Sequence, residues 1–297
     1  DFKSKVVFIL TGSSARKLKR EKDSNLLAGR AITINFFPLN HLEVDYNKNL
    51  DKILAYGTLP EIFLTKTENI IRERLNSYVG TYLNEEVQRE SEIRHIDKFH
   101  RFLEFAASLN GSFANYSKIA RAVGISPPTA REYFQILKDT KIAYEIPPWT
   151  FSVRKQIQQS SKYYFFDNGV LNSLQGEIYG KLKPSSFRYG KRFENLVITE
   201  FVKIISNKRS NVKLFNYQTT SQQEVDLILQ RNTNSPIVAV EIKSNVNPTL
   251  EDIKPLVTFK KDYPAAHCLV LCLTPRMYKL DDIHFFPFLE GLNWAIN

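Results

Sequence analysis

Cysteine is scarce in this chain, since only Cys268 and Cys272 occur among 297 residues. Both lie in the apolar run 267–273, where strand alternation predicts that they are buried on one face as reduced thiols. His267 points to the opposite face of that strand, so these side chains do not supply the four convergent ligands of a zinc site. We therefore expect two core thiols and no zinc.

Long apolar stretches without charge are also absent from the sequence. A membrane-spanning helix needs about 20 consecutive apolar residues, and a secretory signal needs an apolar stretch behind a basic N-terminus. The sequence predicts neither of them. It therefore gives no membrane partner and leaves the cytoplasm as the expected location.

A Gly-x-x-x-x-Gly-Lys-[Ser/Thr] loop is the third absence. In ATPases the backbone N–H groups of this loop cradle the nucleotide phosphates. The chain alone is therefore expected to hydrolyse no ATP, and ATP is expected as a cofactor only of a longer chain.

The composition that remains is that of a basic globular protein. Hydrophobic residues make up 43% and aromatic residues 12% of the sequence, which is enough to build packed cores in about two domains. The formal net charge of +10 favours a polyanionic partner, because Lys and Arg gain affinity by releasing phosphate counterions. DNA is the first candidate, although a run of charge is also typical of an ordinary solvated surface.

The most informative pattern is an ordered series of charged residues in the last third of the chain. Glu194 borders the apolar stripe of a predicted helix, 193–205, and Asp226 lies in the strand-like run 224–229. In the run 238–244, alternation puts Glu241 and Lys243 on one face and the intervening apolar residues on the other. The three carboxylates are therefore expected to converge beside one amine.

Such a cluster suits a divalent-metal phosphodiesterase. Mg²⁺ prefers oxygen ligands, polarises phosphate and generates hydroxide, which predicts Glu194, Asp226 and Glu241 as its ligands. Lys243 would position the attacking water or neutralise charge on the phosphate. The alternative is structural: Glu241 and Lys243 form an ordinary same-face pair, Asp226 lies near a turn, and Glu194 complements a helix dipole.

The order of helix acid, strand Asp and Glu-x-Lys resembles the PD-(D/E)xK nuclease superfamily and its restriction-endonuclease-like core. The matching positions are Glu194, Asp226, Glu241 and Lys243, whereas Val225 stands where that family has a loosely kept Pro. The resemblance implies that these four residues form the catalytic site. The three acids would then be its metal ligands.

The middle of the chain has the pattern of a helix-turn-helix. A short helix ending at Val123, the turn 124–126 and a helix starting at Pro127 precede two strand-like runs, 142–146 and 162–166, around a basic loop at Arg154 and Lys155. This predicts a winged helix. Four side chains of the second helix are expected to face a DNA groove: Thr129, Arg131, Gln135 and Lys138. Winged helices also serve as rigid connectors, whose outward face packs on protein.

The first 45 residues contain an apolar run, 6–10, a small polar turn and a strand-like run, 31–36. The segments FILTGSSARKLKR, LLAGRAITINFFPLNHLE and YGTLPEIF resemble the end of the AAA+ module in a broad prokaryotic group of ATPases with a nuclease-like C-terminal region. The resemblance implies that Ser13, within Thr11 to Ser14, belongs to the strand that senses the γ-phosphate and that Arg30 is an arginine finger. Self-association through the ATPase module follows from it, and we expect the chain to be the C-terminal part of a longer ATPase.

Together these patterns predict a multidomain α/β protein. Residues 1–45 would complete an AAA+ sheet, 46–165 would form a helical domain with the winged helix, and 166–297 would form a restriction-endonuclease-like α/β domain. Two functions stay open. Either the protein is the C-terminal part of a DNA-associated ATPase that cleaves nucleic acid with Mg²⁺, or it is a non-catalytic binding arm of a nucleotide-driven switch.

Overall fold

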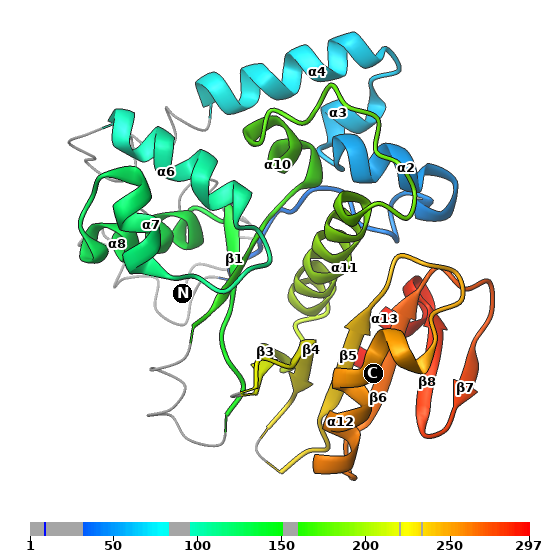
Figure 1. The fold of residues 1–297 in the computed structure, drawn as a ribbon. Coiled ribbons are helices and arrows are strands. Elements are labelled where there is room, and N and C mark those ends of the chain that lie inside the picture. Colours follow the sequence, from blue (N-terminus) through cyan, green and yellow to red (C-terminus); the bar gives the residue numbers. More distant parts are fainter. Residues whose placement is uncertain (1–8, 10–31, 83–95, 151–159, 220, 233) are drawn as a thin grey trace, which may run out of the picture.

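The computed structural model describes residue 9 and residues 32–82, 96–150, 160–219, 221–232 and 234–297. Over these residues the fold is mixed α/β, with ten α-helices and two sheets (Figure 1). The predicted α/β class is thus confirmed. In the described part of the chain, no helix is long and apolar enough to cross a membrane.

The first half is mainly helical. Its elements are α2 (Tyr46–Tyr56), α3 (Pro60–Leu64), α4 (Glu68–Ser77), the π-helical turn Tyr78–Tyr82, α6 (Ile96–Ser108), α7 (Tyr116–Val123), α8 (Pro127–Asp139), β1 (Ala143–Ile146), β2 (Lys162–Phe165) and α10 (Asn168–Leu174).

Local sequence signals define α7 and α8. The Asn115 side chain caps α7, Gly124 ends it with a φ of 75°, and the Ser126 hydroxyl caps α8 directly before Pro127. These are the residues that helix starts and ends favour, because they satisfy the free N–H groups or tolerate the left-handed conformation. The helix–turn–helix elements that the sequence predicts are therefore present, followed by the antiparallel pair β1–β2.

One apolar core holds the helical half together. Its centre is a group of edge-to-face aromatic rings in which Phe102 contacts both Tyr133 and Phe134, and Phe134 stacks on Tyr163 of β2. The core continues past β2 into α10 and reaches Ile178. Residues 166–178 thus pack with the helices that precede them in the chain.

The second half is a six-stranded sheet in the order β3-β4-β5-β6-β8-β7. Its strands are β3 (Lys213–Gln218), β4 (Glu224–Gln230), β5 (Val238–Ile242), β6 (His267–Cys272), β7 (Tyr278–Leu280) and β8 (Ile283–Pro287). The strands β3, β4 and β5 pair antiparallel, whereas β5–β6 and β6–β8 pair parallel.

Helices cover both faces of this sheet (Figure 1). α11 (Phe187–Asn207) and α13 (Phe288–Ile296) share one core with Leu227, Val240 and Leu271. The short 3-10 turn Leu250–Ile253 and α12 (Lys254–Asp262) share the opposite core, which contains both cysteines, Cys268 and Cys272, as free thiols. The prediction that both thiols are buried on one face is confirmed.

Two predicted elements differ from the structure. The helix that carries Glu194 starts at Phe187, so Glu194 lies inside it rather than at its beginning, because the Ser186 side chain caps it earlier. In the predicted strand 31–36, the described residues 32–36 form no strand, and Ile32, Ile34 and Phe36 are exposed. An alternating pattern gives a strand only where a partner strand pairs with it.

The residues predicted to belong to an AAA+ module lie largely outside the described residues. Ser13 and Arg30 lie outside them, as do Arg154 and Lys155 of the predicted wing, and so does the run 6–10 except for Ile9, which is exposed and belongs to no strand. The roles proposed for these residues stay predictions.

Candidate functional site

Asp226 and Glu241 lie side by side on the central strands β4 and β5. The register pairs Leu227 with Val240, which puts the preceding Asp226 next to the following Glu241. The Ile242 N–H donates to Asp226 Oδ2 at 2.8 Å and fixes that carboxylate at the end of β5. The sequence prediction that strand alternation brings these acids together is realised at this point of the sheet.

Glu241 has one occupied and one unoccupied oxygen. Lys243 Nζ lies 2.9 Å from Glu241 Oε1, with the Glu241 side chain 6% exposed and that of Lys243 30% exposed. Glu241 Oε2 is buried and has no hydrogen-bond partner among the described residues. Buried carboxylate oxygens normally have partners, so this oxygen is a vacant acceptor inside the protein.

The protonation of the pair reflects its burial. Burial raises the pKa of Asp226 to about 6, and the nearby Glu194 charge adds to this while Lys162 and Lys243 oppose it. Burial also raises the pKa of Glu241 to about 8, with the Asp226 charge as the next cause and Lys243 opposing. Two like charges close together in a poorly solvated site disfavour double ionisation. Both pKa values are therefore raised from the ordinary acidic range toward neutral pH.

Glu194 reaches the same region from α11. Its Oε1 accepts a hydrogen bond from the Tyr164 hydroxyl at 2.8 Å, and its Oε2 lies 2.9 Å from Lys191 Nζ. Its charge is felt at Asp226, where it raises the pKa. Glu194 is thus a neighbour of the pair whose own two oxygens are already engaged.

One residue of the site that the sequence analysis passed over, Lys162, comes from β2. Lys162 is 3% exposed, lies 2.9 Å from Glu224 Oε2, and sits 4.8 Å from the centre of the Phe113 ring. Although burial lowers its pKa, the charges of Glu194, Asp226 and Glu224 outweigh this and raise it. The only signal in the sequence was a lysine opening the otherwise apolar run KYYFF. The helical half therefore contributes an ammonium group to the acidic site.

A divalent metal fits part of this arrangement. The described residues hold no group of three or more His, Cys, Asp or Glu side chains placed to bind a metal ion. Mg²⁺, however, usually takes only one or two carboxylates and completes its shell with water and phosphate oxygens. Asp226 and the vacant oxygen of Glu241 supply that number, whereas both oxygens of Glu194 are occupied. We therefore take Asp226 and Glu241 as the pair that fits the ion.

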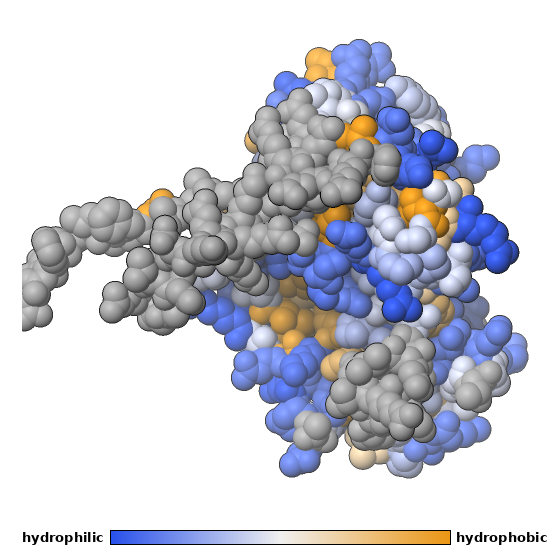
Figure 2. Space-filling view, turned by 90° about the vertical axis from the view of Figure 1, so that its left-hand side faces the viewer, coloured by the Kyte–Doolittle hydropathy of each residue, from blue (hydrophilic) through white to orange (hydrophobic). Residues whose placement is uncertain are grey.

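The four predicted DNA-facing residues of α8 lie on its outer side and contact their own chain. Arg131 stacks over the Tyr116 ring at 5.2 Å, Gln135 donates to Asp139, and Lys138 pairs with Glu145 at 2.7 Å. Thr129 is half-buried, and its hydroxyl bonds to that of Ser126. On the side of the molecule that includes α7 and α8, the described surface is mainly hydrophilic (Figure 2).

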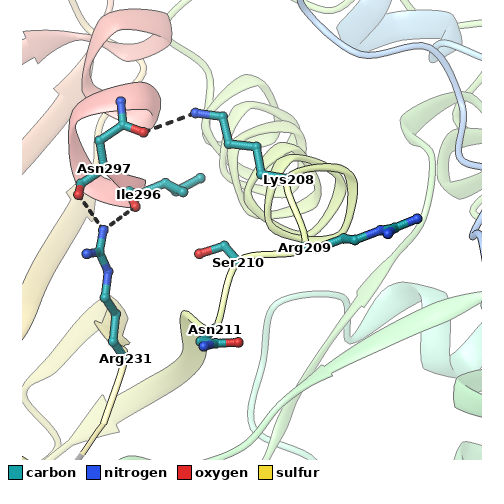
Figure 3. A pocket seen from close by; sticks show the side chains of 7 residues that line it. All are labelled: Lys208, Arg209, Ser210, Asn211, Arg231, Ile296 and Asn297. Atoms are coloured by element: carbon teal, nitrogen blue, oxygen red, sulfur yellow. Dashed lines mark hydrogen bonds between the residues drawn. The ribbon is translucent and has the colours of Figure 1, made fainter.

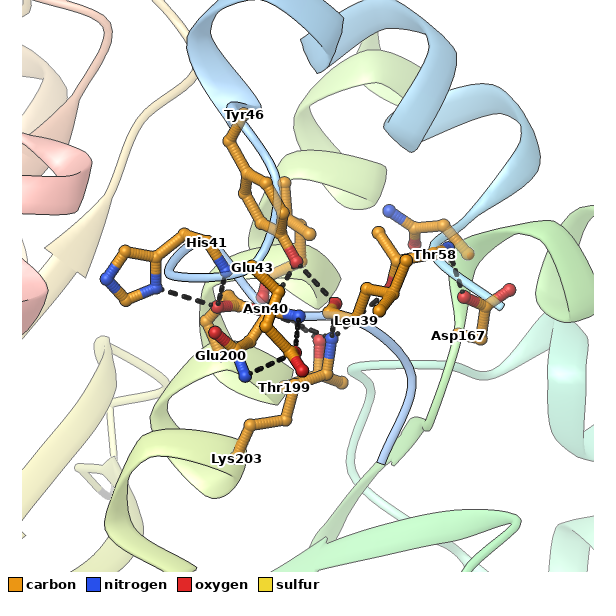
Figure 4. Close-up of polar contacts among 12 residues, drawn as sticks. Leu39, Asn40, His41, Glu43, Tyr46, Thr58, Asp167, Thr199, Glu200 and Lys203 are labelled. Atoms are coloured by element: carbon orange, nitrogen blue, oxygen red, sulfur yellow. Dashed lines mark hydrogen bonds and ion pairs between the residues drawn. The ribbon is translucent and has the colours of Figure 1, made fainter. Parts of the chain in front are cut away.

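A second buried polar cluster lies farther along α11 (Figure 4). Glu200 accepts from Tyr46 at 2.7 Å and from Lys203 at 2.9 Å through Oε1. Its Oε2 accepts from the His41 backbone N–H at 3.1 Å and lies 3.0 Å from His41 Nδ1. This cluster fastens residues 39–46 to α11, since Lys203 also donates to the Leu39 carbonyl.

A surface hollow of about 440 Å³ lies at the other end of α11, away from the acids (Figure 3). Lys208, Arg209 and Arg231 line it, and Arg231 donates to the backbone carbonyls of Ile296 and Asn297. None of the residues predicted from the sequence as site residues lines this hollow.

Comparison with known proteins assigns the two halves to separate domains. Residues 189–290 match the domain of unknown function DUF4143, and residues 47–178 match the domain of unknown function DUF8612. The part of the chain that is similar to DUF4143 includes Glu194, Asp226, Glu241 and Lys243. The DUF8612 match ends at Ile178, where the apolar core of the helical half also ends.

Curated relatives are uncharacterized proteins. One from Mycobacterium tuberculosis is 22% identical over 93% of this chain and 62% of its own length. One from Haemophilus influenzae is 21% identical over 97% of this chain and 70% of its own length, and one from Methanocaldococcus jannaschii is 27% identical over 74% and 52%. The chain thus spans less than two thirds of the mycobacterial relative. No solved structure matches it.

Proposed function

We propose that the C-terminal half is a nuclease-like domain that cleaves nucleic-acid phosphodiester bonds with a divalent metal. The observation that carries this proposal is the buried pair Asp226 and Glu241, with one carboxylate oxygen vacant and Lys243 beside it. A buried carboxylate oxygen without a hydrogen-bond partner costs free energy. Such groups are common where a protein binds a cation or performs chemistry.

The topology around the pair supports the same proposal. The chain runs from helix α11 through the antiparallel strands β3, β4 and β5 to helix α12 and the parallel strand β6. This is the order of helix, Asp strand and Glu-x-Lys strand on which the resemblance to PD-(D/E)xK nucleases rests. The polar pair lies where the two central strands meet, and helices cover both faces of the sheet.

Each residue has a distinct task in this proposal. A bound Mg²⁺ would supply charge for the phosphate and a water of lowered pKa. Asp226 and Glu241 would hold the ion, and Lys243 would orient the attacking water or offset the negative charge that develops on the phosphate. Glu194, held by Tyr164 and Lys191, keeps the site negative and raises the pKa of Asp226. The positive charge of Lys162 offsets part of this negative charge, since it interacts with both Glu194 and Asp226.

The helical half is assigned a supporting role. The order α7, turn, α8, β1 and β2 supports a winged helix, with Arg131 and Lys138 exposed on α8 for contact with DNA. The segments of residues 1–45 that resemble an AAA+ module support a longer ATPase, in which Ser13 and Arg30 would act on ATP and join subunits. In this view ATP drives the longer protein, and this chain forms its DNA-associated arm.

The test is a cleavage assay with supercoiled DNA and labelled oligonucleotides in Mg²⁺ or Mn²⁺. Wild type should cut, whereas Asp226→Asn and Lys243→Ala should each lower the rate by 100-fold or more, as removal of a metal ligand or a charge-stabilising group does. Glu251→Gln, a change at an exposed acid on the surface of the same domain, is the matched control and should cut like wild type. Cutting that survives both site substitutions would exclude this site.

The second candidate is a non-catalytic binding arm. It is favoured by the amines of Lys162, Lys191 and Lys243, which already offset much of the acidic charge without a metal. In that case no variant cuts under any metal, although the protein still binds nucleic acid or a partner. A version of the protein that includes a complete ATPase module should then change its oligomeric state with ATP.

A further inference from the structure

The start of α11 carries an exposed aromatic ring close to the acidic pair. Phe187 is the first residue of the helix and is 82% exposed, although α11 otherwise turns its apolar residues toward the core. The helix start lies at the same end of the sheet as the end of β5 (Figure 1). A β-carbon placed on Gly190 would lie only 3.5 Å from Ser244 Oγ, directly after Lys243. Phe187 therefore lies one helical turn before Gly190, where the helix passes close to Ser244.

A positive charge lies near this ring. Lys191 Nζ lies 5.9 Å from the centre of the Phe187 ring and 2.9 Å from Glu194 Oε2, so one ammonium group lies between the ring and the acidic site. The first turn of α11 contains no acidic residue, and its free N–H groups add partial positive charge. Lys181 and Lys183, just before the helix, are exposed as well. An exposed ring framed by cations is suited to a ligand that is both aromatic and anionic.

We propose that Phe187 and Lys191 form a stacking platform for an unpaired nucleobase, and that the substrate of the site is single-stranded or frayed nucleic acid. An unpaired base offers its flat face to an aromatic ring, whereas the bases of a duplex are stacked on one another. The phosphates on either side of the base would meet Lys191 and the lysines before the helix. The strand would then run past Ser244 toward Lys243.

This inference rests on the proposed function for the position of the cut, but not for binding. It is tested by fluorescence anisotropy in EDTA, with a labelled 12-nucleotide single strand and the duplex of the same sequence. Wild type should bind the single strand more tightly than the duplex. Phe187→Ala should weaken single-strand binding at least fivefold with little change for the duplex, because stacking on one ring contributes about 1–3 kcal/mol per base.

Two further variants sharpen the assay. Phe187→Trp keeps a larger ring and should bind the single strand at least as tightly as wild type. Leu64→Ala removes an equally exposed apolar side chain on α3 and should change nothing. Lys191→Met should flatten the dependence of the affinity on salt by about one phosphate contact. Circular dichroism and thermal unfolding check that each variant is folded.

The outcomes separate the two proposals. If Phe187→Ala binds the single strand like wild type, or if wild type prefers the duplex, the platform is wrong whether or not the protein cuts DNA. If single-strand binding depends on Phe187 but no metal supports cleavage, the platform holds and the nuclease proposal fails. Loss of binding in both Phe187→Ala and Phe187→Trp contradicts stacking, because tryptophan retains an aromatic face.

Discussion

Two buried acids of this protein differ in how completely they are satisfied. Both oxygens of Glu200 accept hydrogen bonds, from Tyr46, Lys203 and His41, whereas Glu241 has one oxygen paired with Lys243 and one without a partner. Burial alone would raise the pKa of Glu200, but the Lys203 ammonium and the hydrogen bonds from its neighbours bring it below the ordinary value. Burial raises the pKa of Glu241 to about 8.

The difference separates a structural acid from a candidate functional one. Glu200 stays ionised because its partners compensate for lost solvation, and it ties residues 39–46 to α11. Glu241 has less compensation, since Lys243 and its other neighbours do not offset its burial, so a proton or a cation would stabilise it further. Burial by itself therefore says little about function, and the count of partners around each oxygen is the informative quantity.

The largest effect is expected at the satisfied cluster. Lys203→Met should lower the free energy of unfolding by about 3–5 kcal/mol at pH 7, because it leaves Glu200 charged and unpaired in the interior. Urea denaturation measures this change. Lys48→Met, at an exposed ion pair with Asp45, is the control and should change stability by less than about 1 kcal/mol. A similarly small loss for Lys203→Met would remove the distinction between the two acids.

The next effect has the opposite sign and concerns Glu241→Gln. The folded pKa of Glu241, about 8, lies above its ordinary value of 4.5, so the folded state holds an extra proton between these pH values and wild type loses stability as pH rises through them. Glutamine removes this dependence. The variant should be more stable than wild type by about 1–3 kcal/mol at pH 8 and equal to it near pH 4.

Glu200→Gln should change the pH dependence of stability in the opposite direction, which thermal unfolding at several pH values measures. A lowered folded pKa contributes stability above the unfolded pKa that is lost as pH falls through the folded value, so this variant should be destabilised at pH 7 and approach wild type in acid. Parallel pH profiles for Glu200→Gln and Glu241→Gln would contradict the comparison.

A metal should bind the unsatisfied pair with a pH dependence. Carboxylates bind metal in their ionised form, and the pKa values of Asp226 and Glu241 are raised to about 6 and about 8. The affinity for Mn²⁺, followed by calorimetry, should therefore rise about tenfold or more from pH 6 to pH 8. Asp226→Asn should weaken Mn²⁺ binding at both pH values, because it removes one ligand, and it should leave part of the rise, because Glu241 still loses its proton over this range. An affinity independent of pH would place the metal elsewhere.

The smallest effect is expected on the surface of α8. Lys138→Ala breaks a half-exposed ion pair with Glu145 and should cost at most about 1 kcal/mol of stability, because solvent screens the pair. If α8 contacts DNA, the same change should weaken binding to DNA of any sequence by a similar factor. Filter binding at several salt concentrations would detect this loss. Glu132→Ala, at an exposed residue of the same helix that is not one of the four predicted DNA contacts, is the control for helix propensity.

Patterns of short range predicted much of this fold. The caps and the proline of α7 and α8 fixed both helices to within a residue, and strand alternation predicted the shared face of Glu241 and Lys243. It also predicted both buried cysteines on β6. Each of these depends only on neighbours in the sequence, where helix and strand periods act directly.

Contacts between distant segments were not predictable in this way. The sequence indicated that Glu194 joins the acids, but not that Tyr164 occupies one of its oxygens, because Tyr164 comes from the helical half. Lys162 reaches the acids by the same route across the two halves. The prediction of a strand at residues 32–36 was wrong for a related reason. Its alternating pattern has no partner strand among the described residues.

The length of α11 has one more consequence. As a single helix of 21 residues it carries Glu194 and, nine residues later, Lys203, which a rise of about 1.5 Å per residue separates by roughly 14 Å along one stiff axis. The same helix therefore carries the Glu200–Lys203 cluster and the Glu194 carboxylate beside the acidic pair. The geometry of the helix fixes the spacing of these two groups. The cluster that binds residues 39–46 therefore stays at a constant distance from Glu194.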